Sequence, residues 1–110
     1  MGIKLVGADK LEKALRNKAK LAAAKQIVKN CGSKLQKGAE NNAPVDSGTL
    51  KRSITIEIED DGLTAVIAPH IDYAAYVEYG TRYMAAQPYM RPAYEKAKAE
   101  FKSKMEELVR

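Results

Sequence analysis

The sequence predicts an α+β fold: a long N-terminal helix packed on a small antiparallel β-sheet, followed by a short tyrosine-rich helix and a C-terminal helix. Apolar residues recur at steps of three and four towards both ends of the chain, which is helical periodicity. Between residues 54 and 68 they instead alternate with polar residues or follow a β-branched run around an Asp-Gly pair, which is typical of a hairpin. At 110 residues we expect one domain, spanning 1–110.

The first helix is expected at about residues 9–42. Asp9 and Glu12 have the spacing of a capping box, which marks a helix start. Its stripe of apolar or small residues consists of Ala14, Asn17, Leu21, Ala24, Val28, Cys31, Leu35 and Gly38. At roughly 1.5 Å per residue the helix would be about 45 to 50 Å long, whereas a compact domain of this size is roughly 25 to 30 Å across. We therefore expect either a break near 30–33, where Asn-Cys-Gly-Ser is weakly helical, or a projecting part that packs on a neighbouring subunit.

The segment APVDSGTLKRS, residues 43–53, predicts a corner between helix and sheet. Pro44 disfavours helical geometry at the residue before it, and the Asp46-Ser47-Gly48 run suits a tight turn or a new N-cap for 49–53. The density of small polar residues invites comparison with a phosphate-binding loop. That interpretation fails on spacing, because Gly48 stands alone and Lys51 has no partner glycine.

The hairpin is expected at 54–68, with Asp61 and Gly62 as the turn pair, because both central residues of a type I′ turn need positive φ. Residues 71–79 are expected to form a short helix, since Tyr73, Tyr76 and Tyr79 fall at helical spacing and Gly80 follows. After a loop at 80–87, the closing helix is expected at 88–110, with Pro92 in its first turn. Its apolar stripe consists of Ala93, Ala97, Phe101, Met105 and Leu108.

Composition argues against several classes of function. Cys31 and His70 are the only cysteine and histidine, so we expect no intramolecular disulfide, no metal and no cofactor. No apolar run has the length of a membrane span, so no membrane partner is expected. Nucleophilic catalysis by Ser47 or Ser53 would depend on His70 as base, and neither serine lies in a nucleophile-elbow motif. A carboxylate pair is equally unsupported among Asp46, Asp72 and Glu78.

Charge and tyrosine content leave alternatives open. The net charge of +5 is dispersed along the chain, which fits a solvated surface and also fits attraction to nucleic acid or to an acidic protein. All six tyrosines lie between 73 and 94, a distribution that fits a protein interface, base stacking or core packing. Glu78 lies among apolar residues and would be stabilised by a partner, for which Arg82 and Arg91 are candidates; the alternative is an ordinary surface acid.

Three sequence elements in this order resemble the phage and prophage tail-component family of tail-completion, or neck and head-tail joining, proteins of long-tailed phages. They are APVDSGTLKRSI at 43–54, YAAYVEYGT at 73–81 and QPYMRPA at 87–93. The resemblance implies a virion structural protein of the tail or neck, without enzymatic activity, that assembles in the host cytoplasm as a homo-oligomeric ring around the DNA channel. Its implied partners are neighbouring neck or tail-tube proteins, with sequence-independent contact to DNA in the channel.

The resemblance also singles out residues for structural or interface roles. They are Pro44, Asp46, Gly48, Leu50, Ser53, Tyr73, Tyr76, Glu78, Tyr79, Gly80, Thr81, Gln87, Pro88, Arg91 and Pro92. In this interpretation the Glu78 carboxylate orders the loop that follows it, and 87–93 begins the last helix. The alternative function is a small basic nucleic-acid-binding module. A hydrolase using Ser47 and His70 is a third class.

Overall fold

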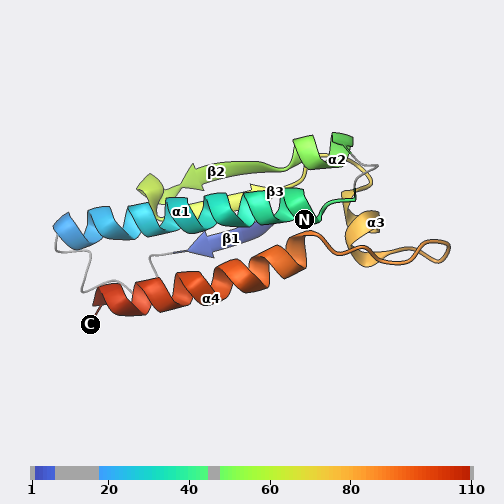
Figure 1. The fold of residues 1–110 in the computed structure, drawn as a ribbon. Helices are drawn as coiled ribbons and strands as arrows, with labels where there is room; N and C mark the ends of the chain where they lie inside the picture. Colours follow the sequence, from blue (N-terminus) through green and yellow to red (C-terminus); the bar gives the residue numbers. More distant parts are fainter. Residues whose placement is uncertain (1, 7–17, 45–47, 110) are drawn as a thin grey trace.

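The computed structural model describes residues 2–6, 18–44 and 48–109. Their elements, in order, are β1 (Ile3–Val6), α1 (Lys18–Asn42), α2 (Gly48–Ser53), β2 (Thr55–Glu59), β3 (Thr64–Ala68), α3 (Ala74–Tyr79) and α4 (Met90–Val109), as drawn in Figure 1. The predicted α+β class is confirmed. The molecule is elongated, with extents of 52 × 21 × 19 Å.

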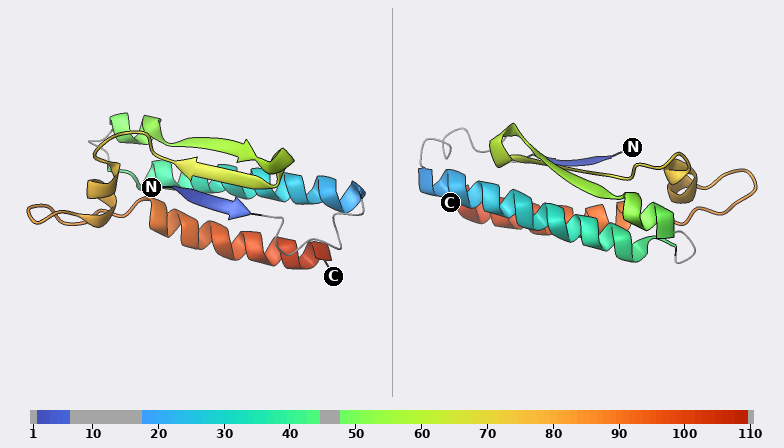
Figure 2. Two further views of the ribbon diagram at one scale, coloured as in Figure 1. Left: turned by 180° about the vertical axis from the view of Figure 1, so that it is seen from behind. Right: turned by 90° about the horizontal axis from the view of Figure 1, so that it is seen from above.

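Two layers run along the long axis. The helices α1 and α4 lie side by side and antiparallel in one layer, and the sheet lies on one face of this pair (Figure 2). Of the two expectations for the first helix, the break near 30–33 is wrong and a projecting part is not seen within residues 18–42, while packing on a neighbouring subunit stays a prediction. The helix α1 continues without a break through 30–33, and it does not project, because α4 and the sheet accompany it. The domain is instead as long as its helices require.

Gly32 explains why α1 does not break at its weakest stretch. A Cβ atom added there would lie 2.9 Å from both Ala65 Cβ and Ile56 Cδ1 of the sheet, closer than real Cβ contacts allow. The glycine therefore lets the helix approach the strands, and it is held helical by packing despite its low propensity. A residue that suggests a helix break in the sequence marks the closest approach between the two layers.

The sheet has the order β1-β3-β2, and both neighbouring pairs are antiparallel. The turn pair is as predicted, because Asp61 has φ 55°, Gly62 has φ 95°, and the Leu63 amide donates to the Asp60 carbonyl at 3.1 Å. Asp60 also has a positive φ of 53°, which was not predicted, and the turn forms a short 3-10 element, η2 (Asp60–Gly62). The strand β1 was not predicted. Ile3 and Leu5 alternate with Lys4, but four residues are too short for a periodic signal, and the pairing with β3 is long-range in sequence.

The core lies between the layers and follows the predicted stripes closely. On α4, Ala93, Ala97 and Met105 are buried, while Phe101 and Leu108 are half-buried. On α1 the buried side chains include Ala24, Val28, Cys31 and Leu35, and Ala39 rather than Gly38 completes the stripe. The sheet contributes Leu5, Ala65 and Ile67.

The element boundaries differ in detail from the expected ones. The short helix begins at Ala74 rather than at 71, and the closing helix begins at Met90 rather than at 88. The expected helix start at Asp9 and the stripe positions Ala14 and Asn17 lie outside the described residues. Within the described part of the chain, no helix combines the length and apolarity that crossing a bilayer requires.

Replacing Gly32 by alanine is expected to lower the free energy of unfolding by about 1 kcal/mol, because overpacking against Ala65 outweighs the gain in helix propensity. Urea unfolding followed by circular dichroism measures the change. Ser33→Ala, at the neighbouring exposed position, is the matched control and should stay within about 0.5 kcal/mol. A Gly32→Ala protein more stable than the wild type would contradict the packing argument.

Candidate functional site

The segment between the sheet and α4 builds one end of the molecule. After β3 the chain makes a short turn, forms α3, extends into a loop at 80–88 and returns to start α4 (Figure 1). The His70 amide donates to the Ser53 carbonyl at 3.1 Å, and this hydrogen bond holds the start of the segment against the end of α2. Most of the residues expected to have interface roles lie in this segment.

Glu78 binds the segment between β3 and α4 to the start of α4. Its side chain is only 4% exposed, and its carboxylate accepts the backbone amides of Tyr89 at 3.2 Å, Met90 at 2.8 Å and Arg91 at 3.3 Å. These amides belong to the first turn of α4 and the residue before it, where helical N–H groups have no partner within the helix. The negative carboxylate also complements the positive end of the helix dipole.

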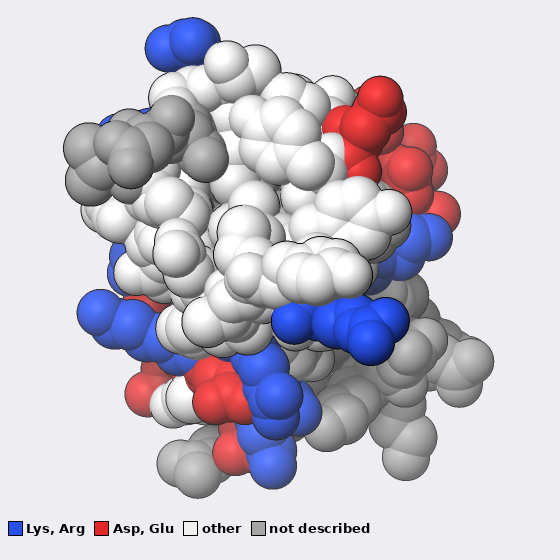
Figure 3. All heavy atoms as spheres, turned by 90° about the vertical axis from the view of Figure 1, so that its right-hand side faces the viewer, with Lys and Arg blue, Asp and Glu red and all other residues white. Residues whose placement is uncertain are grey.

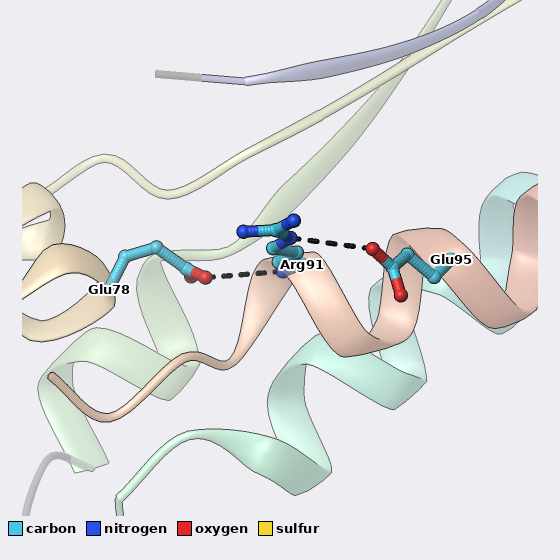
Figure 4. Close-up of polar contacts among 3 residues, drawn as sticks. All are labelled: Glu78, Arg91 and Glu95. Atoms are coloured by element: carbon cyan, nitrogen blue, oxygen red, sulfur yellow. Dashed lines mark hydrogen bonds and ion pairs between the residues drawn. The ribbon is translucent and has the colours of Figure 1, made fainter.

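Both expectations for the environment of Glu78 are wrong. It is not a surface acid, and the guanidinium groups of Arg82 and Arg91 are not its partners. Figure 4 shows that the Arg91 backbone amide points to Glu78, while its side chain reaches Glu95, with 3.4 Å between Nε and Oε1. Arg82 lies over the Tyr83 ring, 5.9 Å from its centroid. A buried carboxylate can be satisfied by backbone donors. Composition and spacing give no signal of these partners, and only the resemblance implied that Glu78 orders the loop after it.

Tyr89 is the one tyrosine in this segment that belongs to the core. Its side chain is fully buried, and its hydroxyl donates to the Ala74 carbonyl at 3.1 Å. Burial raises the pKa of Tyr89 to about 12, and the nearby Glu78 carboxylate adds to this shift. Through Tyr89 and Glu78, α3 is joined to the start of α4 at two points.

The loop at 80–88 is held at its base. Gly80 has φ 78°, and a Cβ atom there would lie 2.7 Å from the Ala86 nitrogen, so only glycine lets the two arms of the loop come together. The Gln87 amide donates to the Val77 carbonyl at 2.8 Å. Thr81 pairs with Met84 in a single β-bridge, and its Oγ1 accepts the Tyr83 amide at 3.2 Å. Beyond this base the loop is exposed to solvent.

We call the exposed aromatic and methionine side chains of this end the aromatic tip. They are Tyr73 at 37% exposed, Tyr76 at 59%, Tyr79 at 72%, Tyr83 at 91% and Met84 at 42%. Seen end on, most of this face is uncharged, and charged groups lie mainly around its margin (Figure 3). Solvent-exposed aromatic residues gathered in this way are the composition of a protein interface rather than of an ordinary surface.

The remaining candidate residues have structural positions. Leu50 is fully buried, and the Ser53 hydroxyl donates to the Leu50 carbonyl at 2.7 Å, so the corner packs on the core. Gly48 begins α2, Pro44 follows the end of α1, and Asp46 lies outside the described residues. Pro88 and Pro92 are exposed on either side of the start of α4. The corner lies at the same end of the molecule as α3, and its Ser53 carbonyl accepts the His70 amide (Figure 1).

Little in the described residues suggests catalysis. The exposed His70 lies 2.7 Å from Thr55 Oγ1, measured from Nε2, and Ser47 lies outside the described residues. Among the described residues there is no group of three or more histidine, cysteine, aspartate or glutamate side chains that could hold a metal ion.

Charge is distributed unevenly between the layers. The helix α1 contains six lysines and one glutamate, whereas residues 55–68 of the hairpin contain four acids and no lysine or arginine. Between α1 and α4 there is a hollow of about 260 Å³, floored by small residues and flanked by lysines. Lys34 on its rim forms an ion pair with Glu100. The helix α1 is therefore strongly basic and the hairpin acidic, whereas β1 has Lys4.

Replacing Glu78 by alanine is expected to lower the free energy of unfolding by about 2 to 3 kcal/mol, because three amides lose a charged acceptor. Glu78→Gln keeps one acceptor oxygen and should lose less. Chemical denaturation measures both changes. The matched control is Glu95→Gln, an exposed acid of α4, for which the expected change is under about 0.5 kcal/mol. Equal stability of Glu78→Ala and the wild type would exclude the capping role.

The raised pKa of Tyr89 predicts an alkaline effect. Because the folded value of about 12 exceeds the unfolded value of about 10, the neutral hydroxyl favours folding below pH 10, and this contribution declines as the pH rises towards 12. Tyr89→Phe removes the ionisable group, so its stability deficit relative to the wild type should shrink between about pH 7 and about pH 11. Urea unfolding at both pH values tests this. A deficit that stays constant would show that folding does not raise the pKa of Tyr89.

The chain was compared with known proteins in three ways. A family model described as "Bacteriophage HK97-gp10, putative tail-component" matches residues 8–80, about two thirds of the chain. The match includes the first two of the three resembling elements, except for Thr81, and ends before 87–93. Searches of curated proteins and of solved structures returned no match. Membership of a tail-component family indicates a virion location and contacts with other virion proteins. The chain belongs to the HK97-gp10-like family of bacteriophage tail components.

Proposed function

We propose that this tail component acts in tail completion or head-tail joining, as a structural protein without catalytic activity, and that it assembles as a ring around the DNA channel. In this role the protein supplies surfaces rather than chemistry. The aromatic tip binds the neighbouring neck or tail-tube protein, and other surfaces join copies of the chain to one another.

The observation that carries this proposal is the aromatic tip. Five large side chains are exposed at one end of a 52 Å molecule, although tyrosine and methionine lose free energy by remaining in water. The Glu78 contacts and Gly80 hold the segment in place without a partner, so little ordering is needed on binding. A largely uncharged end face, with charged groups mainly at its margin, suits end-to-end contact between successive layers of a virion.

A second candidate function is sequence-independent binding of nucleic acid, favoured by the net charge of +5 on α1 and by the lysine-lined hollow beside it. Binding of this kind depends on phosphate contacts and weakens steeply with salt. Titration of duplex DNA at two salt concentrations distinguishes it. If the protein shows no salt-sensitive binding to DNA, the nucleic-acid-binding function is excluded and only the tail-joining proposal remains.

Deletion of the gene from its phage is expected to yield separate filled heads and tails, because the joint between them is incomplete. Electron microscopy of the resulting particles provides the measurement. Tails of uncontrolled length would instead indicate a role in terminating the tail. Normal, joined and infectious particles would exclude both roles.

Complementation of the deletion tests the aromatic tip itself. A Tyr76→Ser, Tyr79→Ser and Tyr83→Ser triple variant should fold but fail to restore joined particles. The control triple, Gln26→Ser, Asn30→Ser and Lys37→Ser, changes exposed residues of α1 and should restore them. Circular dichroism of both purified variants verifies that each is folded.

A further inference from the structure

The sheet ends in two strands that each have an unpaired edge. In the order β1-β3-β2 the central strand is β3, so both β1 and β2 offer a row of backbone amides and carbonyls that no described strand pairs with. Such edges are templates for pairing with another chain, and proteins that do not use them usually protect them. Neither strand contains proline or a bulge. The charged side chains of each strand lie only on the face of the sheet that points away from the helices.

Beyond the edge of β1 lies α4 rather than a further described strand (Figures 1 and 2). The helix layer is wider than the sheet at this side: β1 is the strand nearest to α4, and β2 is the farthest from it (Figures 1 and 2). Contacts between the sheet and the helices are made mainly through α1. Tyr94 and Phe101 of α4 are only half-buried, and Lys98 lies over the Tyr94 ring, 5.7 Å from its centroid. A strand added beside β1 would cover this strip of α4.

The two edges complement each other. By the strand register, Ile56 and Ile58 of β2 lie on the face towards the helices, as do Ile3 and Leu5 of β1. Ile58 is 46% exposed because nothing in the described chain covers it at the edge. On the outer face β2 has Glu57 and Glu59, while β1 has Lys4 and Val6, the latter 40% exposed. Side by side, the two strands would pair isoleucine with aliphatic residues and carboxylate with ammonium.

We propose that β2 of one copy of this chain pairs with the β1 edge of the next copy, so that the sheet continues from subunit to subunit. The contact uses two different surfaces, so it is heterologous and propagates around a ring. Since β1 and β2 run in the same direction within the sheet, cyclic symmetry makes the new pairing parallel. The inference rests on the ring proposed above and names its subunit contact.

Charge reversal tests the contact on the full chain. Lys4→Glu alone, and Glu57→Lys with Glu59→Lys, should each abolish the oligomer and leave monomer, because like charges then face each other across the new pair. The chain with all three changes restores opposite charges and should recover the oligomer. Lys37→Glu and Glu106→Lys, on exposed faces of the helices, are controls that should not change the mass. Light scattering coupled to size exclusion measures the mass.

Cysteine pairs give a second test that also captures a weak oligomer. Lys4→Cys combined with Glu57→Cys, or with Glu59→Cys, should give disulfide-linked ladders under mild oxidation, whereas Lys4→Cys with Lys37→Cys should not. The native Cys31 is buried, and burial raises the pKa of its thiol, so it does not compete. A monomer that forms no ladder with either pair, or an oligomer indifferent to charge reversal, would overturn the proposal.

The two proposals can fail separately. If the gene deletion leaves joined particles, the proposed function is wrong, whether or not β1 and β2 of neighbouring copies pair. If the deletion prevents joining but Lys4→Glu complements it fully, only the edge contact is wrong, and the ring is held by other surfaces.

Discussion

The contact between the Glu78 carboxylate and the start of α4 is the interaction on which the candidate site depends. It joins two segments that are separated by the loop at 80–88, and it gives an acceptor to three amides that have no partner within the helix. Because Tyr89 is fixed by the same region, the first turn of α4 and the whole of α3 form one rigid unit. Tyr76 and Tyr79 of the aromatic tip lie on α3, within this unit, whereas Tyr83 and Met84 lie on the loop whose base Gly80 and Gln87 hold.

A second constraint is the length of α1, which decides the shape of the molecule. A helix of 25 residues cannot be enclosed by a compact domain of this size, and here the other elements extend along it. Small residues make this packing close: Gly32 and Ala65 let the helix approach the sheet, and Gly38 faces Ala93 of α4. The resulting domain is thin and has a large surface, and neither edge of its sheet is paired with a further described strand.

Most of the fold could be predicted from the sequence, because its long periodic segments carry strong signals. The stripe on α4 and the positive φ values at Asp61 and Gly62 follow from local chemistry alone. The strand β1 could not be predicted, since four residues carry too little periodicity and its partner is some sixty positions away in the chain. The continuity of α1 through Gly32 was missed for the opposite reason: tertiary packing overrides a weak local preference.

The candidate site could be predicted only in part. The gathering of tyrosines in one window left an interface, base stacking and core packing open, because which tyrosines face solvent depends on how α3 is held against α4. Tyr89 and Tyr79 are ten residues apart, and one is fully buried while the other is 72% exposed. The backbone partners of Glu78 are also beyond sequence reasoning, because every residue except proline offers the same amide.

The position of Glu78 has a mechanical consequence. The amides at the start of a helix point along its axis, and α4 runs along the length of the molecule (Figure 1). A pull on the end face, directed along that axis, therefore loads the three hydrogen bonds of Glu78 in parallel, so that they must break together rather than one after another. Tension applied at the end of the subunit passes into the axis of a 20-residue helix, which is the stiffest direction that this small protein has.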